Sequence, residues 1–161
     1  MSRALTSRGL DAFVPLYDRV RQWSDRKQVV AWPLFPGYVF VRCGQYDFPM
    51  VLSASGVAAI VRTNGSPDPV PDADIDNVRR FAAALWAAHL EPRQVQIPRR
   101  GEVVRVVSGP LAGIEGIVVR GGGRHRVVIS VQGMRHGFAM TVDAGAVELV
   151  NDTGPGRDRG L

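Results

Sequence analysis

The side chains that most often carry catalysis or bind metals are few and widely spaced in this chain. They are one cysteine and three histidines: Cys43, His89, His125 and His136. No C-x-x-C or paired-histidine spacing connects them, so they do not predict a zinc site. The glycine-rich run GGGRHR at 121 to 126 lacks the G-K-[ST] ending of a phosphate-binding loop and predicts a hairpin tip. Because no nucleophile has a plausible base partner, we expect no enzyme, no catalytic residue, no metal and no cofactor.

A basic segment, DRVRQWSDRKQVVA at 18 to 31, is better suited to binding than to catalysis. The chain has a net charge of +5 and a pI near 10.3, which favours an anionic partner. Lys27 is the single lysine among the 20 basic residues; GC-rich coding explains this preference, although guanidinium also suits phosphate. We expect the segment to be a polar loop, for which a solvated charged surface is the alternative to an anion-binding role.

Length and composition limit the class of protein. The chain has 161 residues, of which 45% are hydrophobic and 22% charged, and this predicts one or two globular domains. No apolar run reaches the ~18 residues of a membrane span, and no apolar signal-peptide core follows the first residues. A single cysteine excludes an internal disulfide. We therefore expect a cytoplasmic monomer without membrane contact.

The elements that would position these residues alternate along residues 1 to 90. A first helix is predicted to stop at Gly9, and the predicted strands are AFVPLY, PLFPGYVFVRC and VAAIVRT. Asp47 is expected to cap a short helix and Asp72 a long one. The long helix should bury one stripe, which comprises Ile75, Val78, Ala82, Leu85, Trp86 and His89.

From residue 91 onward the composition of the chain and its predicted elements change. Residues 91 to 100, EPRQVQIPRR, contain two prolines and predict a linker. Residues 101 to 150 contain five short Val- and Ile-rich runs with glycine turns between them: EVVRVV, GIVVR, RVVISV, RHGFAMTV and AVELV. Such spacing predicts a small closed β-barrel, since closure removes exposed sheet edges. Residues 151 to 161 are expected to be a disordered tail.

Within this third block, four residues have unusual spacing: Gly109, Pro110, Gly113 and Gly116. Glycine and proline set the dihedral angles of a sharp connection between strands. At Gly116, where a strand restarts, a missing side chain permits close backbone approach. A purely structural role is one interpretation. The pattern also resembles the KOW motif of elongation factors and some ribosomal proteins.

The run WSDRKQVVAWPLFPGYVFVR resembles the centre of the NGN domain of the NusG family of transcription factors. The resemblance extends over residues 3 to 150 and implies an α/β, ferredoxin-like NGN domain with an antiparallel sheet at residues 1 to 90. A linker at 91 to 100 and an SH3-like KOW barrel at 101 to 150 would follow. The WSDRK run is similar to specialised antiterminating members. The alternatives are a housekeeping NusG and a KOW-containing, ribosome-associated RNA-binding protein.

The resemblance also implies partners and site residues. A bend at Pro36 and Gly37 would bring Phe35 and Tyr38 to one apolar surface that binds the RNA polymerase clamp, with Leu5 either lining it or lying in the core. The basic segment would contact non-template DNA in the transcription bubble, through Arg19, Arg21, Trp23, Arg26 and Lys27. The barrel would bind Rho or a ribosomal protein near Met134.

Two positions depart from the family pattern. The strand that normally opens an NGN domain is missing, because Met1 falls inside the first helix; we expect the domain to be truncated, with the strand encoded upstream. Near Met134 the usual aromatic residue is absent. Methionine is an adaptable interface residue, but this difference leaves the partner of the barrel open.

Overall fold

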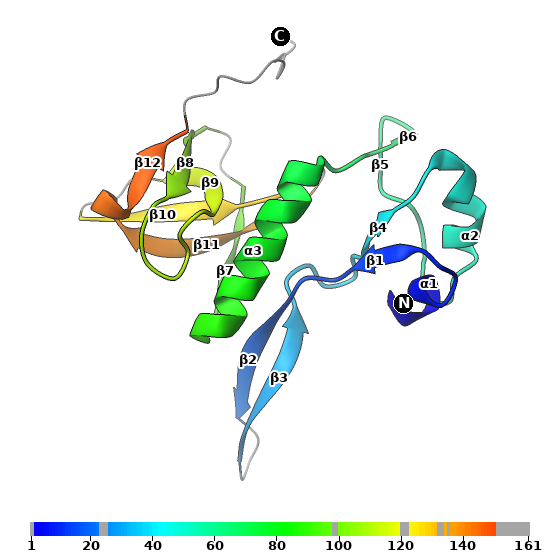
Figure 1. Ribbon diagram of the computed structural model, residues 1–161, viewed down its shortest axis with the longest axis horizontal. Coiled ribbons are helices and arrows are strands. Elements are labelled where there is room, and N and C mark those ends of the chain that lie inside the picture. The colour runs from blue at the N-terminus through cyan, green and yellow to red at the C-terminus, as the bar shows by residue number, and fades with distance from the viewer. Residues whose placement is uncertain are drawn as a thin grey trace.

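The computed structural model describes residues 2–22, 26–97, 100–119, 123–131, 134 and 136–150 (Figure 1). Two of the expectations from the sequence therefore lie outside the described residues, namely the role of Trp23 and the disordered tail at 151 to 161.

The chain begins with helix α1 (Ser2–Thr6) and reverses through Gly9, whose φ of +80° suits glycine. Strand β1 (Asp11–Phe13) then pairs antiparallel with β4 (Phe40–Arg42). Pro15 separates β1 from β2 (Leu16–Gln22). The single predicted strand AFVPLY is therefore two, because proline has no N–H to donate to a ladder.

Strands β2 and β3 (Lys27–Pro33) form a long antiparallel hairpin that projects from the body of the molecule (Figure 1). The expectation of a polar loop at 18 to 31 is therefore wrong. The ladder runs from Leu16↔Pro33 to Gln22↔Lys27, so its backbone groups are paired even though many side chains are polar and exposed.

After β4 the chain forms a 3₁₀ turn η1 (Gln45–Asp47) and a short helix α2 (Phe48–Leu52). Asp47 is at the cap position of α2, but its carboxylate accepts a hydrogen bond from Gly44 N (2.8 Å) instead of from the helix. In the predicted strand VAAIVRT only β5 (Arg62–Thr63) is regular, paired with β6 (Ser66–Pro67). Strand pairing needs a partner, and none of the described strands lies in a ladder with 57 to 61.

Helix α3 (Asp72–Ala88) buries Val78, Phe81, Ala82 and Leu85. Pro71 is at its cap position, so Asp72 opens the helix rather than capping it. The predicted stripe is correct for Val78, Ala82 and Leu85, whereas the Trp86 side chain is 47% exposed and Phe81 takes its place in the core.

A six-stranded antiparallel sheet follows, in the order β12-β8-β9-β10-β11-β7. Its strands are β7 (Arg93–Gln96), β8 (Glu102–Val106), β9 (Glu115–Val119), β10 (Arg124–Ile129), β11 (His136–Asp143) and β12 (Val147–Leu149), with a 3₁₀ turn η2 (Ala144–Ala146) before β12. The last five lie where the five strands were predicted. Closure of this sheet into a barrel stays a prediction, because the hydrogen-bonded order of the described strands ends at β12 and β7.

Strand β7 corrects the expectation that 91 to 100 is a linker throughout. Its residues pair with β11, from Arg93↔Ala139 to Gln96↔His136. The two prolines of the segment, at positions 92 and 98, flank the strand in the sequence. The four residues between them that form β7 all have N–H groups, so they can join the edge of a sheet.

The main hydrophobic core combines elements from both predicted domains. Tyr17, Leu34 and Phe35 from the hairpin and its exit join the buried face of α3 and the apolar side of the six-stranded sheet. A separate small core contains Leu5, Leu10, Val51 and Ala54. The expected boundary at 91 to 100 therefore does not separate two cores.

Candidate functional site

The turn after β3 contains the two aromatics of the PLFPGYVFVR run. Gly37 has a φ of +85°, and Tyr38 N donates to Phe35 O (3.1 Å), so the predicted bend at Pro36 and Gly37 is present. The bend separates the rings instead of uniting them. Phe35 is 6% exposed and Tyr38 is 44% exposed. The expectation of one shared surface is therefore wrong in this structure.

The ring of Phe35 packs in the main core. It stands edge-on to Phe40, with ring centroids 5.8 Å apart, and edge-on to Phe138 of β11, with centroids 5.3 Å apart. Edge-to-face pairs of this kind are favourable beyond the area that they bury. The ring thus joins the N-terminal elements to the six-stranded sheet.

Tyr38 lies at a groove of about 480 Å³ between β4, the 56 to 61 segment and the start of α3. Apolar side chains dominate its walls: Phe13, Tyr38, Val39, Phe40, Val41, Phe48, Val51, Val57, Ile60, Val61, Val70, Ile75 and Met134. Two charged contacts mark its rim, an ion pair between Arg42 and Asp72 (2.7 Å) and Arg79 lying 4.6 Å over the Phe13 ring. A hollow of this composition suits an apolar segment of a partner.

Leu5, a second candidate for the polymerase surface, is a core residue. Its side chain is 0% exposed and packs in the small core with Leu10 and Val51. Of the two alternatives that the sequence left open, the core role is correct.

In the hairpin β2–β3, the alternation of side chains along each strand determines on which face each basic residue lies. Arg19 and Arg21 lie on one face, and their Cζ atoms are 5.1 and 4.7 Å from the centre of the Trp32 ring. Arg26 and Lys27 are exposed near the tip. Lys27 pairs with Gln22 and therefore lies on the opposite face of the hairpin from Arg19 and Arg21. These four basic residues of the hairpin, Arg19, Arg21, Arg26 and Lys27, are called the cationic strip here.

Sequence reasoning missed the place of Trp32 in this strip. It assigned base stacking to Trp23, which lies outside the described residues. Trp32 faces Tyr17 across the ladder and holds both guanidiniums against its ring. The i, i+2 spacing of Arg19 and Arg21 is the signal that could have indicated a strand face.

The base of the hairpin is tied to the residues that follow α3 by an ion pair and by a histidine–carboxylate contact. Arg19 Nε lies 3.1 Å from Glu91, and His89 Nδ1 lies 3.2 Å from Asp18. The Asp18 side chain is 10% exposed, whereas that of His89 is 78% exposed. These contacts hold the direction of the hairpin relative to the helix.

The four residues of the glycine–proline pattern lie around the β8–β9 connection. Gly109 and Gly113 have φ values of +80° and +86°, which favour glycine. A Cβ at Gly116 would lie 2.7 Å from Val128 O and 2.7 Å from Val127 Cγ1, so the predicted close backbone approach is present. Pro110 is exposed in the same turn. The four residues therefore have a structural role, which is to shape the β8–β9 connection and to allow the close approach of the backbone at Gly116.

Met134 is half-buried. It packs against the main core and lines the same groove as Tyr38. The residue expected to receive a partner of the C-terminal unit thus faces the N-terminal elements.

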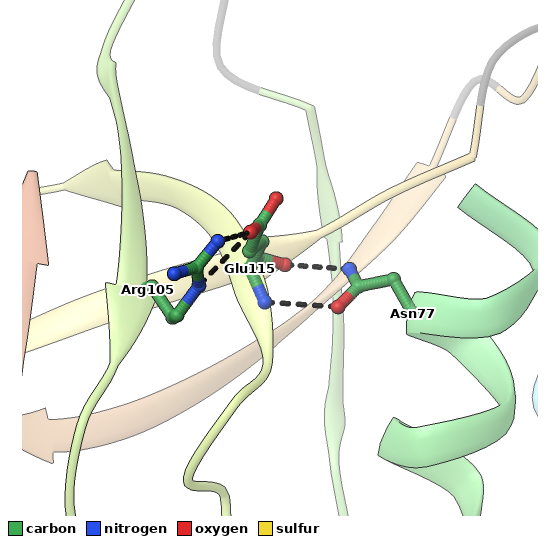
Figure 2. A network of polar contacts seen from close by, with 3 residues as sticks. All are labelled: Asn77, Arg105 and Glu115. Carbon is green, nitrogen blue, oxygen red and sulfur yellow. Dashed lines mark hydrogen bonds and ion pairs between the residues drawn. The ribbon is translucent and has the colours of Figure 1, made fainter. Parts of the chain in front are cut away.

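A polar network that sequence reasoning did not identify joins α3 to the sheet (Figure 2). Asn77 Nδ2 donates to Glu115 O (2.7 Å), and Glu115 N donates to Asn77 Oδ1 (2.9 Å). Arg105 donates to the Glu115 carboxylate from Nε (3.0 Å) and from a terminal nitrogen (2.6 Å). One amide side chain therefore satisfies both backbone groups of a strand residue.

Two titratable groups are shifted by their surroundings. Burial raises the pKa of the Cys43 thiol, and the nearby Asp47 carboxylate raises it further. Burial also raises the pKa of the Tyr17 phenol; Arg19 acts in the opposite direction and Glu91 in the same one. Neither shift produces an activated nucleophile, since a raised pKa lowers the thiolate fraction.

The part of the chain that the structure describes contains no group of three or more His, Cys, Asp or Glu side chains placed to hold a metal ion. None of the helices formed by the described residues is long and apolar enough to cross a membrane.

Comparisons with known proteins identify similar sequences. The family model described as "Transcription termination factor nusG" matches residues 1–79. The chain is 30% identical over 100 residues to the "Transcription termination/antitermination protein NusG" of Thermus thermophilus, covering 58% of this chain and 54% of the relative. It is 32% identical over 113 residues to the protein of the same name from Deinococcus radiodurans, covering 60% of this chain and 57% of the relative. The chain thus spans about half the length of the curated relatives it matches.

Proposed function

We propose, from the similarity of the chain to NusG transcription termination and antitermination proteins, that it belongs to this family and binds RNA polymerase through the apolar surface around Tyr38. It acts there as an elongation and antitermination factor on particular operons. In this role the protein is a binding module that performs no chemical step.

The observation that carries the proposal is the exposure of Tyr38 at an apolar groove. The ring is 44% exposed, and the groove beside it holds about 480 Å³. Exposed aromatics beside apolar hollows concentrate binding energy at protein interfaces. Tyr38 also belongs to the FPGYVFV run, which lies inside the residues matched by the family model.

The mechanism that we propose is a shift of population. The apolar side chains of a clamp segment of polymerase would bind in this groove. Polymerase would then be held in the conformer to which the protein binds best. Binding one conformer better than another stabilises it by the difference in affinity. Holding the closed, elongating conformer would suppress pausing.

The cationic strip supplies the second contact, which we assign to single-stranded non-template DNA. Arg19 and Arg21 are preordered on Trp32, and Arg26 and Lys27 extend the positive charge toward the hairpin tip. Guanidinium groups pair with phosphate, and arginine can also stack on unpaired bases. The projecting hairpin gives this strip reach beyond the body of the molecule (Figure 1).

The six-stranded sheet supplies a third contact, for which we propose Rho or a ribosomal protein near Met134. Methionine adapts its shape to different apolar partners. Because Met134 is half-buried against the groove, such a partner needs a conformer in which this side chain is uncovered.

A binding experiment tests the polymerase contact. Purified core RNA polymerase is immobilised, and the affinities of the wild-type chain, Tyr38→Ala and Tyr46→Ala are measured. Tyr46 is 90% exposed and lies outside the groove, so it is the matched control. We expect Tyr38→Ala to weaken binding about 30-fold, which corresponds to ~2 kcal/mol for an interface aromatic. Equal affinities of the three proteins would contradict the assignment.

A parallel capture with ribosomal subunits addresses the alternative of a ribosome-associated RNA-binding protein, which the pI near 10.3 favours. Retention on subunits together with no retention on polymerase would select that alternative.

A further inference from the structure

One face of the β2–β3 hairpin is apolar and exposed. Val20 pairs directly with Val29, and both side chains are 58% exposed. Leu16, which is 40% exposed, lies on the same face because it precedes Val20 by four residues of the strand. Ala31 is exposed at the position between them. This face is opposite to the one on which two arginines lie against the Trp32 ring.

The apolar surface continues from the hairpin onto helix α3. Leu16 lines a shallow hollow of about 280 Å³ together with Ala83 and Trp86 of the helix. The Trp86 side chain is 47% exposed. Large apolar side chains scattered singly over a surface are ordinary, whereas a group of them marks an interaction site. The hairpin–helix patch is defined here as Leu16, Val20, Val29, Ala31 and Trp86.

Cations stand at both ends of this patch. Lys27, which pairs with Gln22, lies on the same face beyond the two valines and is exposed. Arg79 lines the hollow at the other end. Among the described residues of the hairpin, the carboxylate on this face is that of Asp18, whose side chain is 10% exposed and contacts His89. The charges therefore complement an apolar segment that has acidic residues at its ends.

The patch adjoins the groove at Tyr38. Phe13 and Arg79 line both the groove and the hollow beside Trp86, so one partner can contact both surfaces. Nucleic acid fits this face of the hairpin less well. Its centre is aliphatic, and the guanidiniums of Arg19 and Arg21 lie on the opposite face.

We propose that the hairpin–helix patch is a second contact for RNA polymerase, and that it binds an amphipathic segment whose apolar side chains are flanked by acidic residues. The inference rests on the proposed function and extends the contact surface from Tyr38 to the side of α3 and the projecting hairpin (Figure 1). Because polymerase occupies the apolar face, Arg19 and Arg21 on the other face stay free for DNA.

The variants remove apolar surface and keep the hairpin. Val20→Thr with Val29→Thr replaces one methyl group of each side chain by a hydroxyl. Threonine is β-branched like valine and favours strands, so the ladder is retained. Trp86→Ala tests the helix end of the patch. Val30→Thr is the matched control, because Val30 pairs with Arg19 and lies on the opposite face of the same hairpin.

Affinities are measured for core RNA polymerase without nucleic acid, so that DNA contacts of the cationic strip make no contribution. We expect the double threonine variant and Trp86→Ala each to weaken binding about tenfold. Val30→Thr should bind within about twofold of wild type. Lys27→Glu reverses the charge at one end of the patch and should weaken binding about threefold. Unchanged affinity of the double variant, or tighter binding of Lys27→Glu, would overturn the proposal.

A second measurement does not depend on the threonine variants. A photoreactive diazirine amino acid in place of Val29 is cross-linked in an assembled elongation complex, and the adducts are identified by mass spectrometry. We expect adducts with a polymerase peptide that has acidic residues beside apolar ones. The same amino acid in place of Val30 should not react with that peptide. Adducts of position 29 with DNA alone, or none at all, would contradict the assignment.

The Tyr38→Ala variant separates this inference from the proposed function. Weaker binding of Tyr38→Ala together with unchanged binding of the double threonine variant would keep the groove as the polymerase contact and exclude the patch. The reverse result would keep the patch and exclude the groove. If the wild-type chain does not bind polymerase, both assignments are wrong.

Discussion

The ring of Phe35 stands edge-on against the ring of Phe138, with centroids 5.3 Å apart and planes at 78°. The two residues are more than 100 positions apart in the sequence. The first follows the long hairpin and the second lies in β11, the strand that pairs with both β10 and β7. Their contact makes the N-terminal elements and the six-stranded sheet one packed unit.

The burial of Phe35 predicts a large effect on stability. We expect Phe35→Ala to lower the free energy of unfolding by about 3 to 5 kcal/mol, the usual result of truncating a buried phenylalanine. Urea unfolding followed by circular dichroism measures this change. Tyr46→Ala, at a side chain 90% exposed, should stay within about 0.5 kcal/mol of wild type. Similar midpoints for the two variants would show that Phe35 is not a core residue.

The close approach at Gly116 predicts a second loss of stability. Alanine there places a Cβ 2.7 Å from Val128 O, and backbone cannot yield as a flexible side chain can. We expect Gly116→Ala to cost about 1 to 3 kcal/mol, typical of overpacking. Gly145→Ala is the control, since no atom lies within 4 Å of its added Cβ. Thermal unfolding of both variants provides the comparison, and a neutral Gly116→Ala would contradict the packing at β9–β10.

The shared core predicts how fragments of the chain behave. A fragment of residues 101–150 lacks β7 and α3, so it exposes the apolar side of the sheet and one edge of β11. We expect it to be much less stable than residues 72–150, which keep the helix, the hydrogen bonds between Asn77 and the Glu115 backbone, and β7. Circular dichroism and urea midpoints of the two fragments test this. Equal midpoints would show that the sheet needs neither element.

The cationic strip predicts a specific salt dependence. We expect replacing Arg26 and Lys27 by glutamine to flatten the plot of log affinity for single-stranded DNA against log salt, by about 0.7 for each phosphate that is no longer neutralised. Fluorescence anisotropy with a labelled oligonucleotide measures the slope. A pair of exposed arginines outside the hairpin, Arg93 and Arg126, is the charge-matched control. If both pairs reduce the slope equally, binding follows net charge and not the strip.

The raised pKa of Cys43 predicts slow alkylation. Burial and the Asp47 carboxylate both disfavour the thiolate, so at pH 8 a smaller fraction is ionised than in a free cysteine. Iodoacetamide should therefore react more slowly than it does with glutathione, and the rate should rise at higher pH than usual. Asp47→Asn removes one cause and should speed the reaction. A rate equal to that of glutathione would contradict the shift.

Much of the C-terminal sheet could be predicted from the sequence, because residues close together in the chain determine where its strands lie. Runs of valine and isoleucine bounded by glycine turns determine five strands within one or two residues, and the tight space at Gly116 follows from its place at a strand restart. The hairpin β2–β3 and strand β7 could not be identified this way. Both are polar, and their pairing depends on backbone groups that any residue except proline provides.

For the candidate site too, some features could be predicted from the sequence and others could not. The sequence by itself determined the resemblance to the NusG family, the bend at Pro36 and Gly37, and the concentration of positive charge at 18 to 31, since these depend on residue type and short spacing. Only the tertiary structure decided that Phe35 is buried while Tyr38 is exposed, that Trp32 lies beneath Arg19 and Arg21, and that Asn77 binds the Glu115 backbone. Those relationships join residues distant in the chain, and burial and hydrogen-bond geometry between such residues exist only once the elements have packed.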